Sequence, residues 1–192
     1  MKKIERNQLW YMVISIAASV GLIASFLQLL EKLNLLKHPG ASLYCNLNSV
    51  FNCSNILNAH QSSVFGFPNS LLCIILFTVA LTAGLVGLFG GLIHKYLRFF
   101  FQSLALFTAG FGFWYLWQSI FNVGAICIFC VFCYGGVLAL NTAWFRINYR
   151  DYPLNNKIMR RLDILVTKGF DIFFWCLIGL TIALEALIKF NR

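Results

Sequence analysis

The sequence predicts an all-α integral membrane protein with a four-helix transmembrane bundle and a fifth transmembrane helix. Of its 192 residues, 60% are hydrophobic and only 11% are charged, and the mean hydropathy is +0.77. Soluble domains are about 45–50% apolar and about 25% charged. A water-soluble fold of this size would leave too much of that apolar surface exposed, so lipid must cover it.

Five apolar segments are long enough to cross a bilayer, which takes about 20 residues of helix. The expected spans are residues 10–30, 67–90, 99–120, 126–145 and 169–187. The first is longer than the apolar core of a signal peptide, about 7–15 residues, and has no clean A-x-A cleavage site, so we expect it to be retained. We find no internal repeat and no second domain, and therefore expect one domain over residues 1–192.

Residues 31–66 lack this apolar continuity and are rich in Asn, Ser, His and Gly. We interpret them as a long aqueous loop, and loops of that length are usually functional. Within the loop, residues 51–66 are expected to contain a short interfacial helix that begins after Asn52 or Ser54 as its N-cap.

The basic residues predict the orientation. The net charge of +9 would indicate nucleic-acid binding in a soluble protein, but here Lys and Arg lie between apolar segments. If the N-terminus is cytoplasmic, eleven basic residues face the cytoplasm and four face outward, as the positive-inside rule requires. The eleven are Lys2, Lys3, Arg6, Lys95, Arg98, Arg146, Arg150, Lys157, Arg160, Arg161 and Lys168, and the four are Lys32, Lys37, Lys189 and Arg192.

This topology, derived without the cysteines, places two cysteine pairs at the outer face. Cys45 and Cys53 lie in the long loop, and Cys127 and Cys130 begin the fourth span. Disulfides persist outside the cytosol. Cys127-Ile-Phe-Cys130 is a C-x-x-C motif at a helix N-terminus, where the helix dipole stabilises a thiolate. The pattern predicts thiol–disulfide exchange at the outer face.

Structural and metal-binding interpretations of these cysteines also remain open. The loop pair could be a static disulfide, the C-x-x-C pair could fill a helix interface, or the four thiols could bind zinc. Cys73, Cys133 and Cys176 lie inside spans, and we interpret them as structural because buried cysteine behaves as a small hydrophobe.

Two other functions also remain. The first is a non-enzymatic membrane protein with a structural loop disulfide, and the second is a small transporter or metal-binding protein. Transport usually needs ionisable groups inside the membrane. The spans hold few, chiefly Asp171 and Glu185 near the ends of the fifth.

The four cysteines stand in a specific pattern of motifs. These are Cys45, then Phe51-Asn-Cys53-Ser54, then Phe65-Gly66-Phe67-Pro68, then Gly124-Ala125-Ile126-Cys127-Ile-Phe-Cys130. The order and spacing resemble the vitamin K epoxide reductase family and its bacterial homologues over roughly residues 10–145. The resemblance implies a four-helix bundle around a quinone, capped by the loop.

The resemblance also implies a role for each cysteine. Cys130 would be the thiolate that reduces the quinone, and Cys127 would be its disulfide partner. Cys127 would exchange with Cys53, and Cys45 would be the exposed shuttle cysteine that meets the substrate protein. The implied activity is a quinone-dependent thiol–disulfide oxidoreductase, with reduction of vitamin K quinone or epoxide as a further reaction of the family.

Three further residues match quinone-site positions of the family. Tyr134 matches a tyrosine near the quinone ring, Phe65 a pocket-capping aromatic, and Asn69 an amide that binds a quinone oxygen. Ala59 departs from the family, which usually has Ser or Thr there. We expect either that Ser62 or Ser63 substitutes or that this hydroxyl is dispensable.

The implied cofactor is a quinone of the ubiquinone or menaquinone/vitamin K type. Many bacterial members carry a fused thioredoxin-like domain, which this sequence does not show. We therefore expect a separate thioredoxin-like or DsbA-like protein as redox partner on the outer side. The expected location is the cell inner (cytoplasmic) membrane, with the active site facing the periplasm or exterior.

Overall fold

The computed structural model describes residues 2–40, 43–48, 50–152 and 155–190. The fold-class prediction is confirmed: the structure is 82% helical, and its described residues include five helices long and apolar enough to cross a membrane. Those helices are α1 (Lys2–Lys37), α3 (Asn69–Leu88), α4 (Lys95–Gln118), α5 (Ile128–Asn148) and α7 (Phe170–Phe190). Arg192 lies outside the described residues, as do the side chains of Lys2, Lys3, Arg6 and Arg150.

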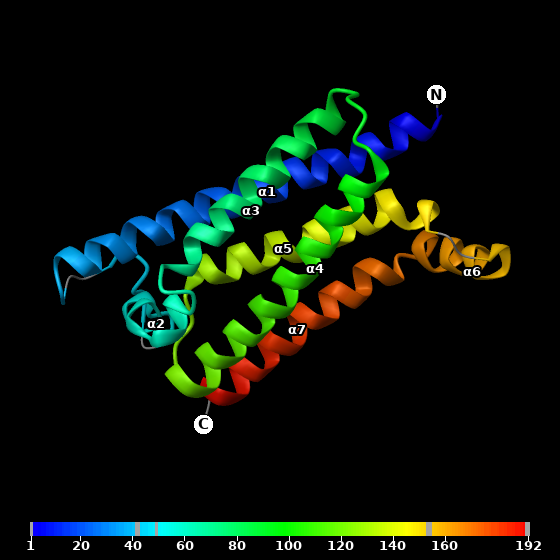
Figure 1. The fold of residues 1–192 in the computed structure, drawn as a ribbon. Coiled ribbons are helices and arrows are strands. Elements are labelled where there is room, and N and C mark those ends of the chain that lie inside the picture. The colour runs from blue at the N-terminus through cyan, green and yellow to red at the C-terminus, as the bar shows by residue number, and fades with distance from the viewer. Residues whose placement is uncertain (1, 41–42, 49, 153–154, 191–192) are drawn as a thin grey trace.

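Shorter elements connect the five long helices. They are α2 (Cys53–Asn58), the 3-10 turns η1 (His60–Ser63) and η3 (Tyr149–Asp151), the π-helical turn η2 (Ser119–Val123) and α6 (Asn156–Thr167). Figure 1 shows α2 at the end of the bundle where α4 turns into α5, while the N-terminus and α6 lie toward the other end. The only β-type pairing in the described residues is an isolated bridge between Phe51 and Ile126.

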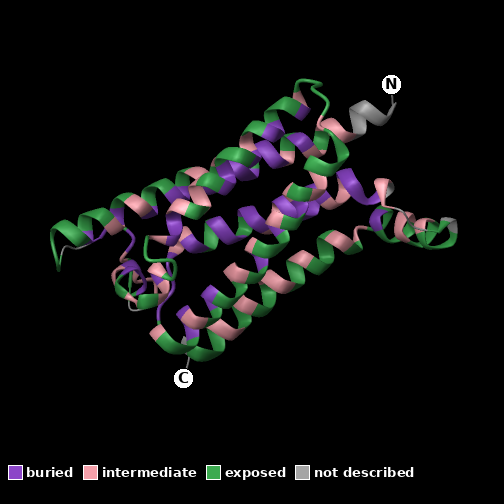
Figure 2. Ribbon diagram, viewed as in Figure 1, coloured by how far each residue is buried: buried purple, intermediate pink, exposed green. Residues whose placement is uncertain are grey.

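Helix α5 is the centre of the bundle. It packs against α1 and α4, and α1 packs along α3. Of the residues in its candidate span, 56% are buried, against 6% in α7, which lies at the periphery (Figure 2). Close packing of α1 on α3 depends on Gly21, because a Cβ there would lie 2.3 Å from Cζ of the fully buried Phe77. Small residues permit this approach where helices pack in lipid.

Helix α1 is longer than the sequence predicted. The expected loop began at residue 31, but α1 continues to Lys37. Leu35, on this extra length, is buried in the apolar cluster that also contains Leu57 from the loop. The helix therefore projects past the bundle and becomes the surface on which the loop folds.

The short interfacial helix expected in the loop is present as α2. Of the two candidate N-caps, Asn52 is the one used, since its side chain accepts a hydrogen bond from the Asn55 backbone N–H at 3.1 Å. This cap orients the first turn of α2, which begins with Cys53. Helix α6 was not expected, because residues 146–168 read only as a polar and basic connection.

Candidate active site

A short backbone pairing holds the loop against the start of α5. Ile126 donates its N–H to Val50 O at 2.8 Å, and Asn52 donates to Ile126 O at 3.2 Å. In each of the two paired segments, a cysteine comes next in the chain: Cys53 follows Asn52, and Cys127 follows Ile126. This register brings the two cysteine pairs together.

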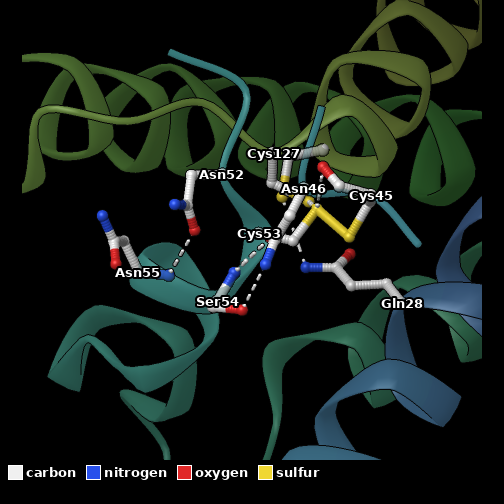
Figure 3. The surroundings of a disulfide bond; sticks show 9 residues. Gln28, Cys45, Asn46, Asn52, Cys53, Ser54, Asn55 and Cys127 are labelled. Carbon is white, nitrogen blue, oxygen red and sulfur yellow. Dashed lines mark hydrogen bonds between the residues drawn. A yellow bond between two sulfur atoms is a disulfide. The ribbon is translucent and has the colours of Figure 1, made fainter. Parts of the chain in front are cut away.

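The four sequence-predicted cysteines meet at one site. Cys45 and Cys53 form a disulfide, with their Cα atoms 5.7 Å apart. Cys127 and Cys130 are free thiols. Sγ of Cys127 lies 3.4 Å from Sγ of Cys53 (Figure 3). A reduced thiol thus contacts one sulfur of an intact disulfide, the arrangement that thiol–disulfide exchange requires.

Both cysteines of the loop disulfide are buried. Cys45 is 3% exposed and Cys53 is fully buried, packed with Leu43 and Ile56 in the apolar cluster of the loop. The expectation that Cys45 is exposed is therefore wrong, whereas its expected role as the cysteine that meets a partner protein stays a prediction. Tyr44, which precedes Cys45 in the chain, is 93% exposed.

Polar side chains fix the two ends of the disulfide loop to each other. Asn46 donates from Nδ2 to Ser54 Oγ at 2.7 Å and accepts from the Ser54 backbone N–H at 3.1 Å. These residues directly follow Cys45 and Cys53, as Figure 3 shows. The paired contacts hold the two cysteines in register.

Lys32 attaches the loop to helix α1. Its Nζ donates to Leu57 O and, at 3.2 Å, to Ser62 Oγ. The Ser62 hydroxyl in turn donates to Leu57 O at 2.7 Å. Ser62, one of two residues expected to replace the hydroxyl absent at Ala59, thus uses its hydroxyl within the loop.

The pKa of the Cys127 thiol is lowered in the structure. Cys127 is the N-cap residue of α5 and precedes the membrane-spanning segment. A hydrogen bond with Cys130 lowers the pKa of Cys127, against the opposing effect of burial. A thiol of lower pKa leaves a disulfide faster, so this hydrogen bond makes Cys127 a better leaving group from a disulfide with Cys53.

A cavity adjoins the inner thiol, Cys130, between helices α1, α3, α4 and α5. It is lined mostly by apolar and aromatic groups, with a few polar ones. The residues that matter below are Gln28, Asn69, Tyr115, Cys130 and Tyr134. An apolar pocket with few convergent polar groups is typical of a small-molecule site, but this cavity measures only about 60 Å³, against about 300–1,000 Å³ for typical ligand sites. It would have to widen to admit a ligand.

The three predicted quinone-site residues fall at different places. Tyr134 and Asn69 line the cavity. Phe65 is half exposed and does not line the cavity. Its ring lies 5.8 Å from the ring of Phe111, which does line the cavity. Asn69 donates from Nδ2 to Gln61 O at 2.7 Å, and within the described part of the chain its buried Oδ1 has no hydrogen-bond partner. That acceptor fits the hydroxyl of a quinol.

Sequence reasoning missed two cavity residues. Gln28, which is buried in α1, donates to Cys130 Sγ at 3.2 Å. Tyr115 of α4 is buried and interacts with Cys130. The sequence did offer a signal for Gln28: an amide side chain inside a predicted span is costly in lipid, so such a residue is often functional. No periodicity distinguishes Tyr115 from the other aromatic residues.

The fold and site define a polytopic helical membrane protein with a disulfide and a dithiol in contact at one end of its bundle. The model of the vitamin K epoxide reductase family matches residues 12–144, so the chain belongs to that family. It is a family of thiol–disulfide oxidoreductases that use quinones and a redox partner protein in a membrane setting. A comparison with curated proteins finds no match.

Proposed function

We propose that the protein is a quinone-dependent oxidoreductase that reoxidises a thioredoxin-like protein outside the cytoplasm. The observation that carries the proposal is the 3.4 Å contact between Sγ of Cys53 and Sγ of Cys127. This contact joins a loop disulfide to a dithiol beside an apolar cavity. Two pairs are needed because a protein substrate does not enter lipid, whereas a quinone tail does not leave it.

The cysteines act in sequence. The loop must first open, because Cys45 is only 3% exposed. A partner thiolate then attacks Cys45 and releases the Cys53 thiolate, and the second partner thiol completes reduction of the pair. Cys53 then attacks Cys127 of an oxidised Cys127–Cys130 pair and releases the Cys130 thiolate. Cys45 resolves the mixed disulfide, which leaves Cys45–Cys53 oxidised and Cys127 and Cys130 reduced. The structure has this last redox state.

Residues of the cavity fit the final acceptor. A quinone held there would supply the acceptor for the two electrons and two protons of the dithiol. Cys130 is placed to deliver the electrons, since it is the cysteine of the pair that lines the cavity. The Tyr134 hydroxyl is a donor for a carbonyl oxygen of the ring, and Asn69 Oδ1 is an acceptor for the hydroxyl of the product.

The distribution of charge supports the proposed orientation, with the cysteines outside and the N-terminus in the cytoplasm. At the end of α5 opposite the cysteines, Arg98 pairs with Asp151 at 2.5 Å, and Arg146 pairs with Asp171 at 2.5 Å. The basic helix α6 lies toward that end (Figure 1). Basic residues concentrate on the cytoplasmic side of membrane proteins.

Anaerobic titration of the purified protein with a quinone tests the proposal. With the dithiol reduced, we expect a charge-transfer absorbance between the Cys130 thiolate and the ring, followed by quinol formation in a one-to-one ratio. Ubiquinone and menaquinone titrated in parallel show which class binds. In the Cys130→Ser control the absorbance should be absent. Quinol formation by Cys130→Ser at the wild-type rate would refute the scheme.

The burial of Cys45 and Cys53 favours one alternative, a non-enzymatic protein with a structural disulfide. Incubation with a reduced thioredoxin-like protein whose second cysteine is replaced separates the two. A relay protein accumulates a mixed disulfide through Cys45, whereas a static disulfide leaves both proteins unlinked.

A further inference from the structure

Gln28 is a polar residue in an unusual position. It lies in α1, within a helix long and apolar enough to span the membrane, and only 7% of it is exposed. Burying an amide without a hydrogen-bond partner costs free energy. Gln28 Nε2 is instead directed at a sulfur, and donates to Cys130 Sγ at 3.2 Å.

The two thiols of the C-x-x-C pair have different neighbours. Cys127 contacts the loop disulfide through Cys53. Cys130 contacts Gln28 and lines the cavity. Figure 3 shows the Gln28 side chain reaching the cysteine cluster from α1, whereas the loop residues approach it from elsewhere. Among the described cysteines, the one to which Gln28 donates a hydrogen bond is therefore the inner thiol, Cys130.

We propose that Gln28 is a catalytic residue whose side-chain amide stabilises negative charge on Cys130 Sγ. This inference rests on the proposed function and assigns the group that assists it at the inner thiol. When Cys53 attacks Cys127, the Cys127–Cys130 bond breaks and its electron pair goes to Cys130. Gln28 donates a hydrogen bond to that leaving thiolate. Hydrogen bonds to charged groups are stronger than neutral ones.

Stabilising the thiolate stabilises the reduced pair relative to its disulfide. The redox equilibrium of the pair therefore reports on Gln28 without any quinone. The experiment equilibrates the full-length protein in detergent with a glutathione redox buffer. It then measures the dithiol-to-disulfide ratio of Cys127 and Cys130 by differential alkylation and mass spectrometry.

The variant Gln28→Met keeps the length of the side chain but removes the donor. We expect its dithiol-to-disulfide ratio to fall about tenfold, equivalent to a potential about 30 mV more negative. Gln28→Asn, whose shorter amide does not reach the sulfur, should shift the ratio in the same direction and serves if the Met variant does not fold.

Ser25→Ala is the matched control. Ser25 is one turn earlier on α1, is fully buried, and its hydroxyl also contacts a cysteine sulfur, that of Cys133 at 3.2 Å. We expect a wild-type ratio for this variant. An unchanged ratio in a folded Gln28 variant, or an equal shift in Ser25→Ala, overturns the inference. If the wild type reduces no quinone, the proposed function is refuted. The dithiol-to-disulfide ratio still tests whether Gln28 stabilises the Cys130 thiolate, because that measurement needs no quinone.

Discussion

Cys53 Sγ and Cys127 Sγ lie 3.4 Å apart although the two residues are 74 positions apart in the chain. One belongs to a disulfide and the other is a free thiol. The backbone pairing between Phe51 and Ile126 sets this distance, because it holds the residues that precede both cysteines. The proposed exchange between Cys53 and Cys127 would therefore need little rearrangement at these two sulfurs.

The contact predicts a specific cross-link. In the double variant Cys45→Ala/Cys130→Ala, Cys53 and Cys127 keep free thiols side by side. Mild oxidation should join them into an intramolecular disulfide in most molecules, detected by non-reducing electrophoresis and peptide mass spectrometry. Cys53 pairing with Cys176 instead, or only intermolecular dimers, would contradict the observed register.

Single cysteine variants should separate the two halves of the relay. Cys127→Ala and Cys130→Ala should each lower quinone reduction to background, since either change destroys the dithiol. Cys45→Ala should block electron transfer from the partner protein but leave one turnover of a pre-reduced Cys127–Cys130 pair. Cys176→Ala, an exposed cysteine on α7, is the control and should behave as wild type. Full activity in all three relay variants would refute the mechanism.

The hydrogen bond between Cys130 and Cys127 predicts a pH dependence. Because it lowers the pKa of Cys127, the Cys127 thiolate should form at a lower pH than it would without this hydrogen bond. In Cys130→Ala this hydrogen bond is lost, so the midpoint of thiolate formation should move to higher pH. The ultraviolet thiolate absorbance, taken relative to the same protein with Cys127→Ser, measures it. A midpoint that stays or falls would contradict the assignment.

Lys32 should stabilise the loop. Lys32→Met removes the donor to Leu57 O and Ser62 Oγ, and we expect the loop to lose about 1–2 kcal/mol of local stability. Hydrogen exchange over residues 53–63 should accelerate, while quinone reduction by a pre-reduced dithiol stays at the wild-type rate. Lys37→Met, an exposed lysine of the same helix, is the matched control. Equal exchange in the two variants would show that the contact is unimportant.

Gly21 should be required for the packing of α1 on α3. Gly21→Val places a branched side chain where Phe77 lies, and overpacking of this kind costs about 1–3 kcal/mol. We expect a lower thermal unfolding temperature in detergent. Gly110→Ala is the control, because no atom lies within 4 Å of its added Cβ. An unchanged unfolding temperature for Gly21→Val would mean that the helices separate without cost.

Much of the fold followed from local properties of the sequence. Continuous apolar length predicts the five spans, since a helix must be about 20 residues long to cross lipid. The cap at Asn52 predicts α2, because a side-chain oxygen there satisfies a free N–H of the first turn. Helix α6 was not predicted. Its apolar residues alternate with polar and basic ones, so the segment was interpreted only as a polar and basic connection. Likewise, apolar residues past residue 30 extended α1 beyond the predicted end.

The candidate site divides in the same way. By itself, the sequence determined which cysteines stand in two close pairs and that five apolar segments accompany them, because residue type and spacing carry that information. Only the tertiary structure decided that Cys53 contacts Cys127, that Cys45 is buried, and that Gln28 donates to Cys130. These contacts join residues 74 and 102 positions apart, or depend on the side chains that cover a sulfur. They arise from helix packing and loop docking, which no local pattern encodes.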